Sequence, residues 1–266
     1  MLGYNHILAH CDCRRDDLNA ASADQSLDLS AAPQSRRVHT ITDRFSMANT
    51  FLIDDEHLIV VDPGSALNVQ LLCNYVERFL QRSPVDIDLI VLTHLHPDHT
   101  AGVRELRSIC NAPVAASAII RRLAQEEVRV GKARPRIGHF AGQVLPGPLH
   151  HLDLFPPAYT QQMKYIDIWL DDVVGLPLHP DWRVIASPGH TPESLCLYNP
   201  FTQELLCGDT VITLEGGAPL LRGSSNRRQL EETLRVLRSL PVHYLYPGHG
   251  RPILGRRPLS NADVEW

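Results

Sequence analysis

Apolar residues along the chain follow two periods, and the period of each stretch predicts its secondary structure. Short apolar or alternating runs bounded by polar turns predict strands, whereas apolar residues spaced three and four apart predict helices. The expected strands are residues 38–42, 48–53, 57–61, 89–92, 114–116, 166–170, 182–186, 194–198, 204–207 and 243–246. The expected helices are residues 67–80, 103–110, 119–130 and 230–240. Because strands and helices alternate, the pattern predicts an α/β layer architecture.

Two stretches of the chain break this pattern. Residues 11–36 are rich in Asp, Ala and Ser and carry few large apolar side chains, so we expect residues 1–37 to form a flexible lead-in. Residues 131–165 combine five prolines and four glycines with large side chains, and a long loop of this kind is usually functional. We therefore expect one domain over residues 38–266, with a substrate-covering insertion at about 131–165. The large side chains of this insertion are Phe140, Phe155, Tyr159, Met163 and Tyr165.

The composition is that of a globular protein and narrows the function. With 44% hydrophobic and 21% charged residues, the 266-residue chain fits neither a collagen-like, a coiled-coil nor a wholly disordered protein. The 25 Lys and Arg residues against 30 Asp and Glu, for a net charge of −5, argue against a nucleic-acid partner. No apolar run is long enough to span a membrane, and the first residues lack a signal-peptide pattern. The expectation is a cytoplasmic protein without membrane contact.

The six cysteines are scattered along the chain rather than spaced as a disulfide framework. Cys11 and Cys13, beside His10, are interpreted as part of the solvated lead-in, because four ligands at structural metal-site spacing are not present there. The other four stand among apolar neighbours and are expected to be small core residues: Cys73, Cys110, Cys196 and Cys207.

The chain contains 14 histidines, and histidine is the commonest metal ligand in proteins. Four ligand-type side chains fall within six residues directly after the apolar run 89–92: His94, His96, Asp98 and His99. In α/β sheets, ligands bind at the carboxyl ends of strands, where this run ends. A tight loop restricted by Pro97 can divide the four side chains between two metal ions, two to each.

Three later strands each end on one more ligand-type residue. His190 follows the expected strand 182–186, Asp209 follows 204–207, and His249 follows 243–246. Each stands in a short Gly- or Pro-containing exit from its strand. One such residue would indicate only a turn, but four strand ends that all carry ligand-type residues indicate one shared metal site.

The set His94-x-His96-x-Asp98-His99, followed by His190, Asp209 and His249, resembles the motifs of the metallo-β-lactamase superfamily, in order and in full. Asp62, in Val-Val-Asp-Pro-Gly, matches the first motif of that family, and the resemblance covers roughly residues 38–252. It implies an αββα sandwich, with two mixed β-sheets flanked by helices. It also implies that a first metal is held by His94, His96 and His190, a second by Asp98, His99 and His249, and that Asp209 bridges both. Asp62 would orient a ligand from outside the coordination sphere.

The expected function is that of a binuclear metal-dependent hydrolase. Two divalent ions can share a hydroxide, which attacks a carbonyl carbon of an ester, thioester or lactone. Asp98 and Asp209 are the expected catalytic carboxylates, with Asp98 as a candidate for moving the proton to the leaving group. Imidazole and carboxylate ligands without thiolate favour two zinc ions and leave iron and manganese open. No Gly-x-Ser-x-Gly elbow for a serine nucleophile is present.

Departures from the motifs of individual subfamilies narrow the activity further. Asp209 stands where the true lactamases of the superfamily carry cysteine or serine, which argues against antibiotic hydrolysis. Glyoxalase II enzymes share every ligand but continue into a helical C-terminal domain, whereas this sequence ends 17 residues after His249. Lactonases share the ligand set and need no such extension. We therefore expect a glyoxalase II-like or lactonase-like hydrolase without that helical domain, acting on a small-molecule acyl substrate.

Two alternatives stay open at this point. One is a persulfide dioxygenase-like oxidoreductase with a single iron, which shares the Ser-Pro-Gly-His-Thr-Pro segment around His190. The other is a non-catalytic metal-binding protein of the same fold. His150 and His151 are interpreted as a surface pair rather than as further ligands, since no acid is placed beside them by the sequence. A homodimer is left open.

Overall fold

In the computed structural model, the described residues are 37–43, 48–130, 159–171, 175–213, 219–222, 226–255 and 257–265. Their helices are α1 (Ala66–Arg78), η1 (Pro84–Asp86), α2 (Pro97–Thr100), α3 (Val103–Cys110), α4 (Ile119–Val130), α5 (Tyr159–Gln162), η4 (Met163–Tyr165) and α6 (Arg227–Ser239). Their strands are β1 (Val38–Thr42), β2 (Asn49–Asp54), β3 (Leu58–Val61), β4 (Ile87–Val91), β5 (Val114–Ser117), β6 (Ile168–Leu170), β7 (Gly175–Leu176), β8 (His179–Ala186), β9 (Leu195–Asn199), β10 (Glu204–Gly208), β11 (Ile212–Thr213), β12 (Pro219–Arg222), β13 (Tyr244–Pro247), β14 (Ile253–Leu254) and β15 (Asp263–Glu265).

Two six-stranded sheets form the centre of the molecule. The first has the order β1-β2-β3-β4-β5-β6 and the second the order β14-β13-β10-β9-β8-β7. The first sheet is antiparallel from β1 to β3 and parallel from β3 to β6. In the second sheet only β10 and β13 are parallel. Both sheets are therefore mixed, as expected. The strands β11, β12 and β15 form a third, three-stranded sheet.

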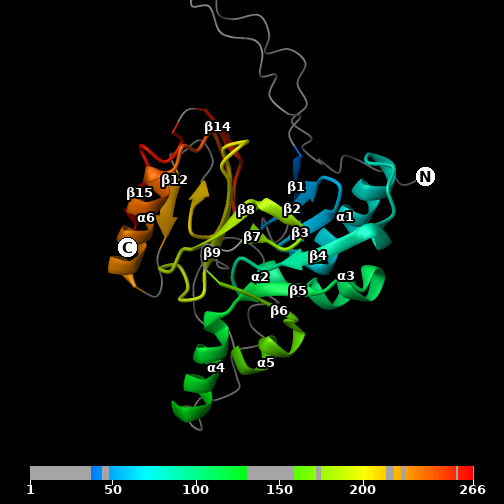
Figure 1. Ribbon diagram of the computed structural model, residues 1–266, viewed down its shortest axis with the longest axis horizontal. Coiled ribbons are helices and arrows are strands. Elements are labelled where there is room, and N and C mark those ends of the chain that lie inside the picture. Colours follow the sequence, from blue (N-terminus) through cyan, green and yellow to red (C-terminus); the bar gives the residue numbers. More distant parts are fainter. Residues whose placement is uncertain are drawn as a thin grey trace, which may run out of the picture.

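Three apolar layers hold the sheets and helices together. Between the sheets, Phe51 and Leu89 of the first pack in one cluster with Leu197 of the second. On the outer face of the first sheet, a second cluster joins α1 and α3 to the strands, and Figure 1 shows these helices on that side. On the outer face of the second sheet, α6 packs through leucines such as Leu237, and Figure 1 shows it on the opposite side of the molecule. This order of layers confirms the αββα sandwich.

Local capping explains where two of these helices begin. Ser65 accepts a hydrogen bond from the backbone of Asn68, and the Asn68 side chain accepts one from the backbone of Ser65. Such a capping box satisfies two of the amide groups that a helix start leaves free. The Asn226 side chain accepts from the backbone of Gln229 and caps α6 in the same way. Both helices thereby begin close to the strand ends where ligand-type residues cluster.

Most of the expected elements are present, with ends displaced by a few residues. Residues 97–100, expected as loop, form the helical turn α2, because Pro97 occupies its first position and needs no amide partner there. Residues 159–165, expected as the end of the insertion, are the short helices α5 and η4. The strand expected at 166–170 starts only at 168, since residue 166 still ends η4.

Several expectations fall on residues outside the described part of the chain. These are the lead-in with Cys11 and Cys13, the insertion up to residue 158, and the pair His150 and His151. The division of the chain into lead-in, domain and insertion thus stays a prediction. The other four cysteines are free thiols, three of them buried and Cys73 half-buried, so the expectation of small core residues is confirmed. None of the described helices is both long and apolar enough to cross a membrane.

Candidate metal centre

The ligand-type residues lie at the carboxyl ends of strands from both sheets. In the first sheet, Asp62 directly follows β3, and the loop 93–99 follows β4. In the second sheet, His190, Asp209 and His249 follow β8, β10 and β13. Because the two sheets face each other, these five strand ends meet at one edge of the sandwich.

The loop after β4 turns sharply so that its side chains separate into two pairs. His96 is the residue before α2, with extended backbone at φ −68° and ψ 145°. His94 and His96 face the same position, because their ligand atoms belong to one group. Asp98 and His99 lie on the first turn of α2 and face the neighbouring position. This division is the one that the resemblance to the superfamily implied.

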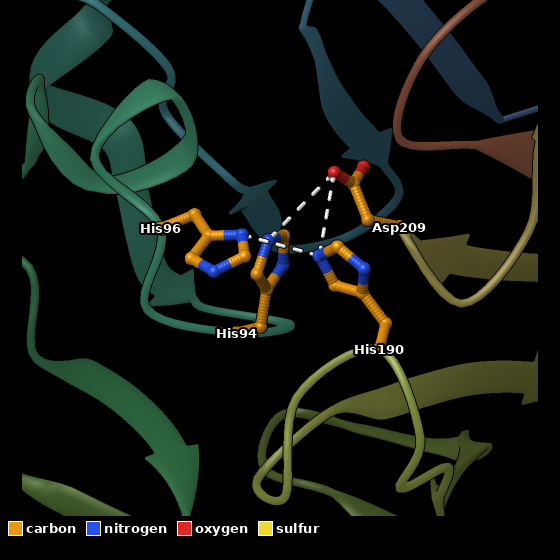
Figure 2. Close-up of side chains that lie close together, drawn as sticks. All are labelled: His94, His96, His190 and Asp209. Carbon is orange, nitrogen blue, oxygen red and sulfur yellow. Dashed lines mark hydrogen bonds and ion pairs between the residues drawn. The ribbon is translucent and has the colours of Figure 1, made fainter. Parts of the chain in front are cut away.

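The first cluster contains His94, His96, His190 and Asp209, whose ligand atoms lie within 4.8 Å of one another. Figure 2 shows the three imidazole rings gathered in front of the Asp209 carboxylate. His190 Nε2 lies 3.1 Å from His96 Nδ1 and 3.7 Å from Asp209 Oδ2. His94 Nε2 lies 3.9 Å from the same carboxylate oxygen. Three nitrogens and one oxygen thus surround one point.

The second cluster contains Asp98, His99, Asp209 and His249. His249 Nε2 lies 3.1 Å from Asp98 Oδ2 and 3.3 Å from Asp209 Oδ2. His99 Nε2 lies 3.2 Å from Asp209 Oδ1 and 3.3 Å from His249 Nε2. All seven residues predicted as ligands therefore lie in one of two adjacent clusters, and Asp209 belongs to both.

Asp209 reaches both clusters because the chain opposite it carries no side chain. A Cβ atom on Gly248 would collide with the Asp209 carboxylate and with the backbone of Gly208. Gly208 itself has φ +48°, a conformation that favours glycine. The glycines before Asp209 and before His249 therefore allow the close approach of the two strand exits.

Asp62 lies behind His99 rather than among the ligand atoms. Its Oδ2 is 3.0 Å from His99 Nδ1, while His99 Nε2 faces Asp209 and His249. Thr93 donates to both Asp62 oxygens, from its backbone N–H at 2.8 Å and from its hydroxyl at 2.6 Å. Asp62 also has φ 53°, which is costly for a residue other than glycine and is retained mostly at functional sites. This geometry suits a residue that orients the His99 ring.

Charges within the clusters bias the protonation of the side chains. Burial, with the neighbouring imidazoles of His99 and His96, holds the pKa of His94 well below its usual range. Burial would also lower the pKa of His249, but the carboxylate of Asp209 outweighs it and raises this pKa to about 9. Burial acts against ionisation of Asp209, yet His249 and His99 hold its pKa well below the ordinary value. Burial also acts against ionisation of Asp98, but His99 and His249 hold the pKa of Asp98 below its ordinary value. Two ionised carboxylates in a buried site favour a bound cation.

Two buried atoms of the clusters show that the side chains fit metal ions. His94 Nε2 and Asp209 Oδ1 are shielded from solvent and make no hydrogen bond within the structure. Leaving such groups unsatisfied costs about 1–3 kcal/mol each. Imidazole nitrogens and carboxylate oxygens without thiolates are typical ligands of divalent transition-metal ions. Divalent cations would satisfy both atoms.

Three further residues position the ligands, and sequence reasoning assigned none of them a role. Thr93 fixes Asp62, as described above. The Asn49 amide donates to the carbonyl groups of Pro247 and Gly250, both at 2.8 Å, and so holds the loop of His249. The Thr233 hydroxyl of α6 donates to the carbonyl of Pro188 at 2.7 Å and holds the loop of His190. The local sequence gives no signal for these roles, since each residue has another polar residue directly beside it in the chain.

A family model described as the metallo-beta-lactamase superfamily matches residues 43–249, a span that contains both clusters and Asp62. The chain belongs to this superfamily. The predicted resemblance is thereby confirmed. The fold implies divalent metal ions, and the His and Asp clusters could bind metal. Metal-dependent hydrolysis is the general activity that the family and its members' names support.

Proteins with sequences similar to this chain carry two kinds of name. A hydroxyacylglutathione hydrolase of Idiomarina loihiensis is 26% identical over 188 residues, which are 71% of this chain and 54% of that protein. A probable metallo-hydrolase of Methanocaldococcus jannaschii is 27% identical over 211 residues, which are 76% of this chain and 87% of that protein. The chain therefore spans about half the length of the first relative and most of the second.

Solved structures of the superfamily share the fold. A metallo-beta-lactamase family protein from Thermus thermophilus has a TM-score of 0.54 at 19% identity, covering 82% of this chain and 74% of that one. Another protein, crystallised in a di-iron-bound form, has a TM-score of 0.50 at 22% identity, covering 78% of this chain and 89% of that one. At these identities the likeness concerns the arrangement of strands and helices.

Proposed function

We propose that this protein is a binuclear metal-dependent hydrolase that cleaves an ester, a thioester or a lactone. The observation that carries the proposal is the position of Asp209. Its Oδ2 lies between His190 of the first cluster and His249 of the second, and its Oδ1 faces His99. A carboxylate placed in this way suits a bridge between two ions. Its neighbours divide into a nitrogen-rich cluster and a cluster that also contains Asp98.

The side chains have separate roles in this proposal. His94, His96 and His190 hold one ion, Asp98, His99 and His249 hold the other, and Asp209 contacts both. When bound, two divalent ions lower the pKa of water and polarise a carbonyl oxygen, so no serine or cysteine nucleophile is needed. The side chain of Asp98 is 12% exposed and that of Asp209 is 6% exposed. Asp98 is thus the carboxylate with more access to solvent, and we assign it the transfer of a proton to the leaving group.

We propose zinc as the metal, because zinc favours imidazole and carboxylate ligands at low coordination number. A structural neighbour is described in a di-iron-bound form, so iron is the competing occupant. Elemental analysis of protein purified without added metal decides between them. Two zinc ions per chain are expected, and two iron ions per chain would contradict the choice of metal while retaining the binuclear centre.

For the substrate, we propose a small acyl compound, with thioesters tested first. Relatives named hydroxyacylglutathione hydrolase support this order, since an acylglutathione is a thioester. The relatives that match this chain over most of their own length are named only as probable metallo-hydrolases. Esters and lactones therefore belong in the same panel of substrates.

The decisive experiment tests protein of measured metal content against matched thioesters, esters and lactones. We expect turnover of at least one class, with activity that is lost on chelation and restored by Zn²⁺. If the protein turned over none of the compounds, this result would contradict the proposed hydrolase activity and favour a non-catalytic metal-binding protein. One iron per chain with oxygen uptake on glutathione persulfide would instead establish the mononuclear dioxygenase.

A further inference from the structure

The backbone between His94 and His96 is held by two side chains from distant parts of the chain. The N–H of Leu95 donates to Oε1 of Glu193 at 3.3 Å. The carbonyl of Leu95 accepts a hydrogen bond from the Gln162 amide at 2.9 Å. One of these groups belongs to the peptide that joins Leu95 to His94, and the other to the peptide that joins it to His96. Both peptide planes that orient the two histidines are therefore tied.

The side chain of Leu95 provides the third support for this backbone. Leu95 is fully buried and belongs to the apolar cluster on the outer face of the first sheet. The burial of Leu95 fixes the residue between His94 and His96, whose ligand atoms both lie in the first cluster. Their rings lie 4.7 Å apart between centroids, and the ring of His190 is 4.8 Å from that of His96.

Glu193 links this backbone to α5. It is only 1% exposed, and its Oε2 accepts a hydrogen bond from the Tyr159 hydroxyl at 2.8 Å. Tyr159 and Gln162 are three residues apart on α5, so they lie on the same face of that helix. One face of α5 thus contacts Leu95 twice, directly through Gln162 and indirectly through Tyr159 and Glu193.

Glu193 also belongs to the loop that carries the third histidine. It lies three residues after His190, and the next strand begins with the Leu195 N–H donating to the Thr93 carbonyl at 2.9 Å. The contacts of Glu193 and Leu195 therefore flank His94 on both sides. Burying a carboxyl group is costly, and an apolar side chain would fill this space at lower cost. What the buried carboxylate of Glu193 contributes is the pair of hydrogen bonds that it accepts, from Leu95 and from Tyr159.

We propose that Tyr159, Gln162 and Glu193 form a positioning clamp that sets the orientation of His94 and His96 and thereby the metal affinity of the first cluster. The inference rests on the proposed metal centre. None of the three side chains is among the ligand-type residues of the two clusters, so they act through the Leu95 backbone. Residues that orient metal ligands from outside typically alter metal affinity by 10–100-fold.

The test compares zinc affinity of the full-length chain, freed of metal, by competition with a chromophoric chelator. Gln162→Ala is paired with Gln161→Ala, which changes an exposed residue of the same helix. Tyr159→Phe is paired with Tyr246→Phe, which also removes a hydroxyl that donates to a buried glutamate, Glu204, at 2.9 Å. Circular dichroism confirms that each variant is folded.

We expect Gln162→Ala and Tyr159→Phe to weaken zinc binding by about 10-fold, with both controls within about two-fold of the wild type. Glu193→Ala should weaken it at least as much. Glu193→Gln should recover most of the affinity, because its amide oxygen can still accept from Leu95. The visible spectrum of bound Co²⁺ should change in the clamp variants and stay unchanged in the controls.

Two results would overturn the clamp while leaving the metal centre intact. One is wild-type zinc affinity and an unchanged Co²⁺ spectrum in folded Gln162→Ala and Tyr159→Phe proteins. The other is equal weakening in clamp and control variants, which would show a general loss of stability. A wild-type chain that binds no zinc would overturn the metal centre and the clamp together, so the two failures are distinguishable.

Discussion

At the scale of single residues, the site depends on which nitrogen of each imidazole faces the cluster. His99 presents Nε2 to Asp209 because its Nδ1 faces Asp62. His94 presents Nε2 because its Nδ1 lies 3.1 Å from the Thr93 hydroxyl. A histidine with one nitrogen held in this way offers the other as a ligand without reorientation. The partners of the histidines therefore matter as much as the histidines themselves.

Asp62→Asn is expected to weaken metal binding by about 10–100-fold. Both oxygens of Asp62 accept hydrogen bonds, so the amide NH₂ of asparagine would face a donor wherever it is placed. Zinc competition titration measures the loss. Asp88→Asn is the matched control, because Asp88 also accepts from a histidine and a backbone N–H, at His57 and Leu58, away from the clusters. Equal affinities in the two variants would contradict the orienting role of Asp62.

Asp209→Ala is expected to reduce turnover to the background of the assay while the fold is retained. Among the described residues, Asp209 is the carboxylate that belongs to both clusters, so neither of the two proposed ions would keep its full set of ligands. Steady-state kinetics on the best substrate of the panel, with elemental analysis and circular dichroism, checks the outcome. Unchanged kinetics would refute the bridging position.

At the scale of elements, α6 supports the loop of His190. A Cβ on Gly189 would collide with the backbone of Leu230, so the loop packs directly on the helix. This contact depends on the apolar face of α6 remaining seated on the second sheet, through side chains such as Leu237. The exposed face of the same helix carries Arg and Glu residues in i,i+4 ion pairs that contribute little to stability.

Leu237→Ala is therefore expected to lower the free energy of unfolding by about 2–5 kcal/mol. Leu237 is fully buried, and its removal leaves a cavity between α6 and the second sheet. Its neighbour Val236 is 50% exposed, so Val236→Ala should change the free energy of unfolding by less than about 0.5 kcal/mol. Urea denaturation of the metal-free variants measures both. Similar losses of unfolding free energy in the two variants would mean that α6 does not pack on the second sheet through Leu237.

At the scale of the whole molecule, the two clusters join the two sheets. Asp98 and His99 come from the first sheet, while His190, Asp209 and His249 come from the second. Each cluster takes ligand atoms from both. A metal bound only by the folded chain therefore stabilises the packing of the sheets against each other.

Removal of metal by a chelator is expected to lower the melting temperature. With free metal at 100 times its dissociation constant, the stabilisation is about 2.7 kcal/mol. For a domain of this size that corresponds to a shift on the order of 5–10 °C. Scanning calorimetry with and without chelator measures it, and Asp209→Ala serves as the control that should not respond. A melting temperature indifferent to chelator would mean that the clusters do not bind metal in the folded protein.

The limits of prediction differ between fold and site. Long amphipathic helices such as α4 (Ile119–Val130) were predictable because their apolar period is repeated several times. The buried strand β4 was predictable because its apolar run is continuous and short. Strands of two residues, such as β7 and β11, were not, because so short a run has no period. Turn α2 was missed since four residues give too little helical pattern beside a Pro and two histidines.

The sequence by itself determined the class of the fold and which residues carry ligand-type side chains, because strand ends and Gly or Pro exits are local features. Only the tertiary structure decided which distant side chains meet. The contacts of Asn49 with the loop of His249, and of Gln162 and Glu193 with Leu95, join residues far apart in the chain. A hydrogen bond needs a partner at a fixed distance and angle, and the local pattern of apolar and polar residues does not specify one. For that reason the ligand-type residues could be predicted from the sequence, whereas the residues that position them could not.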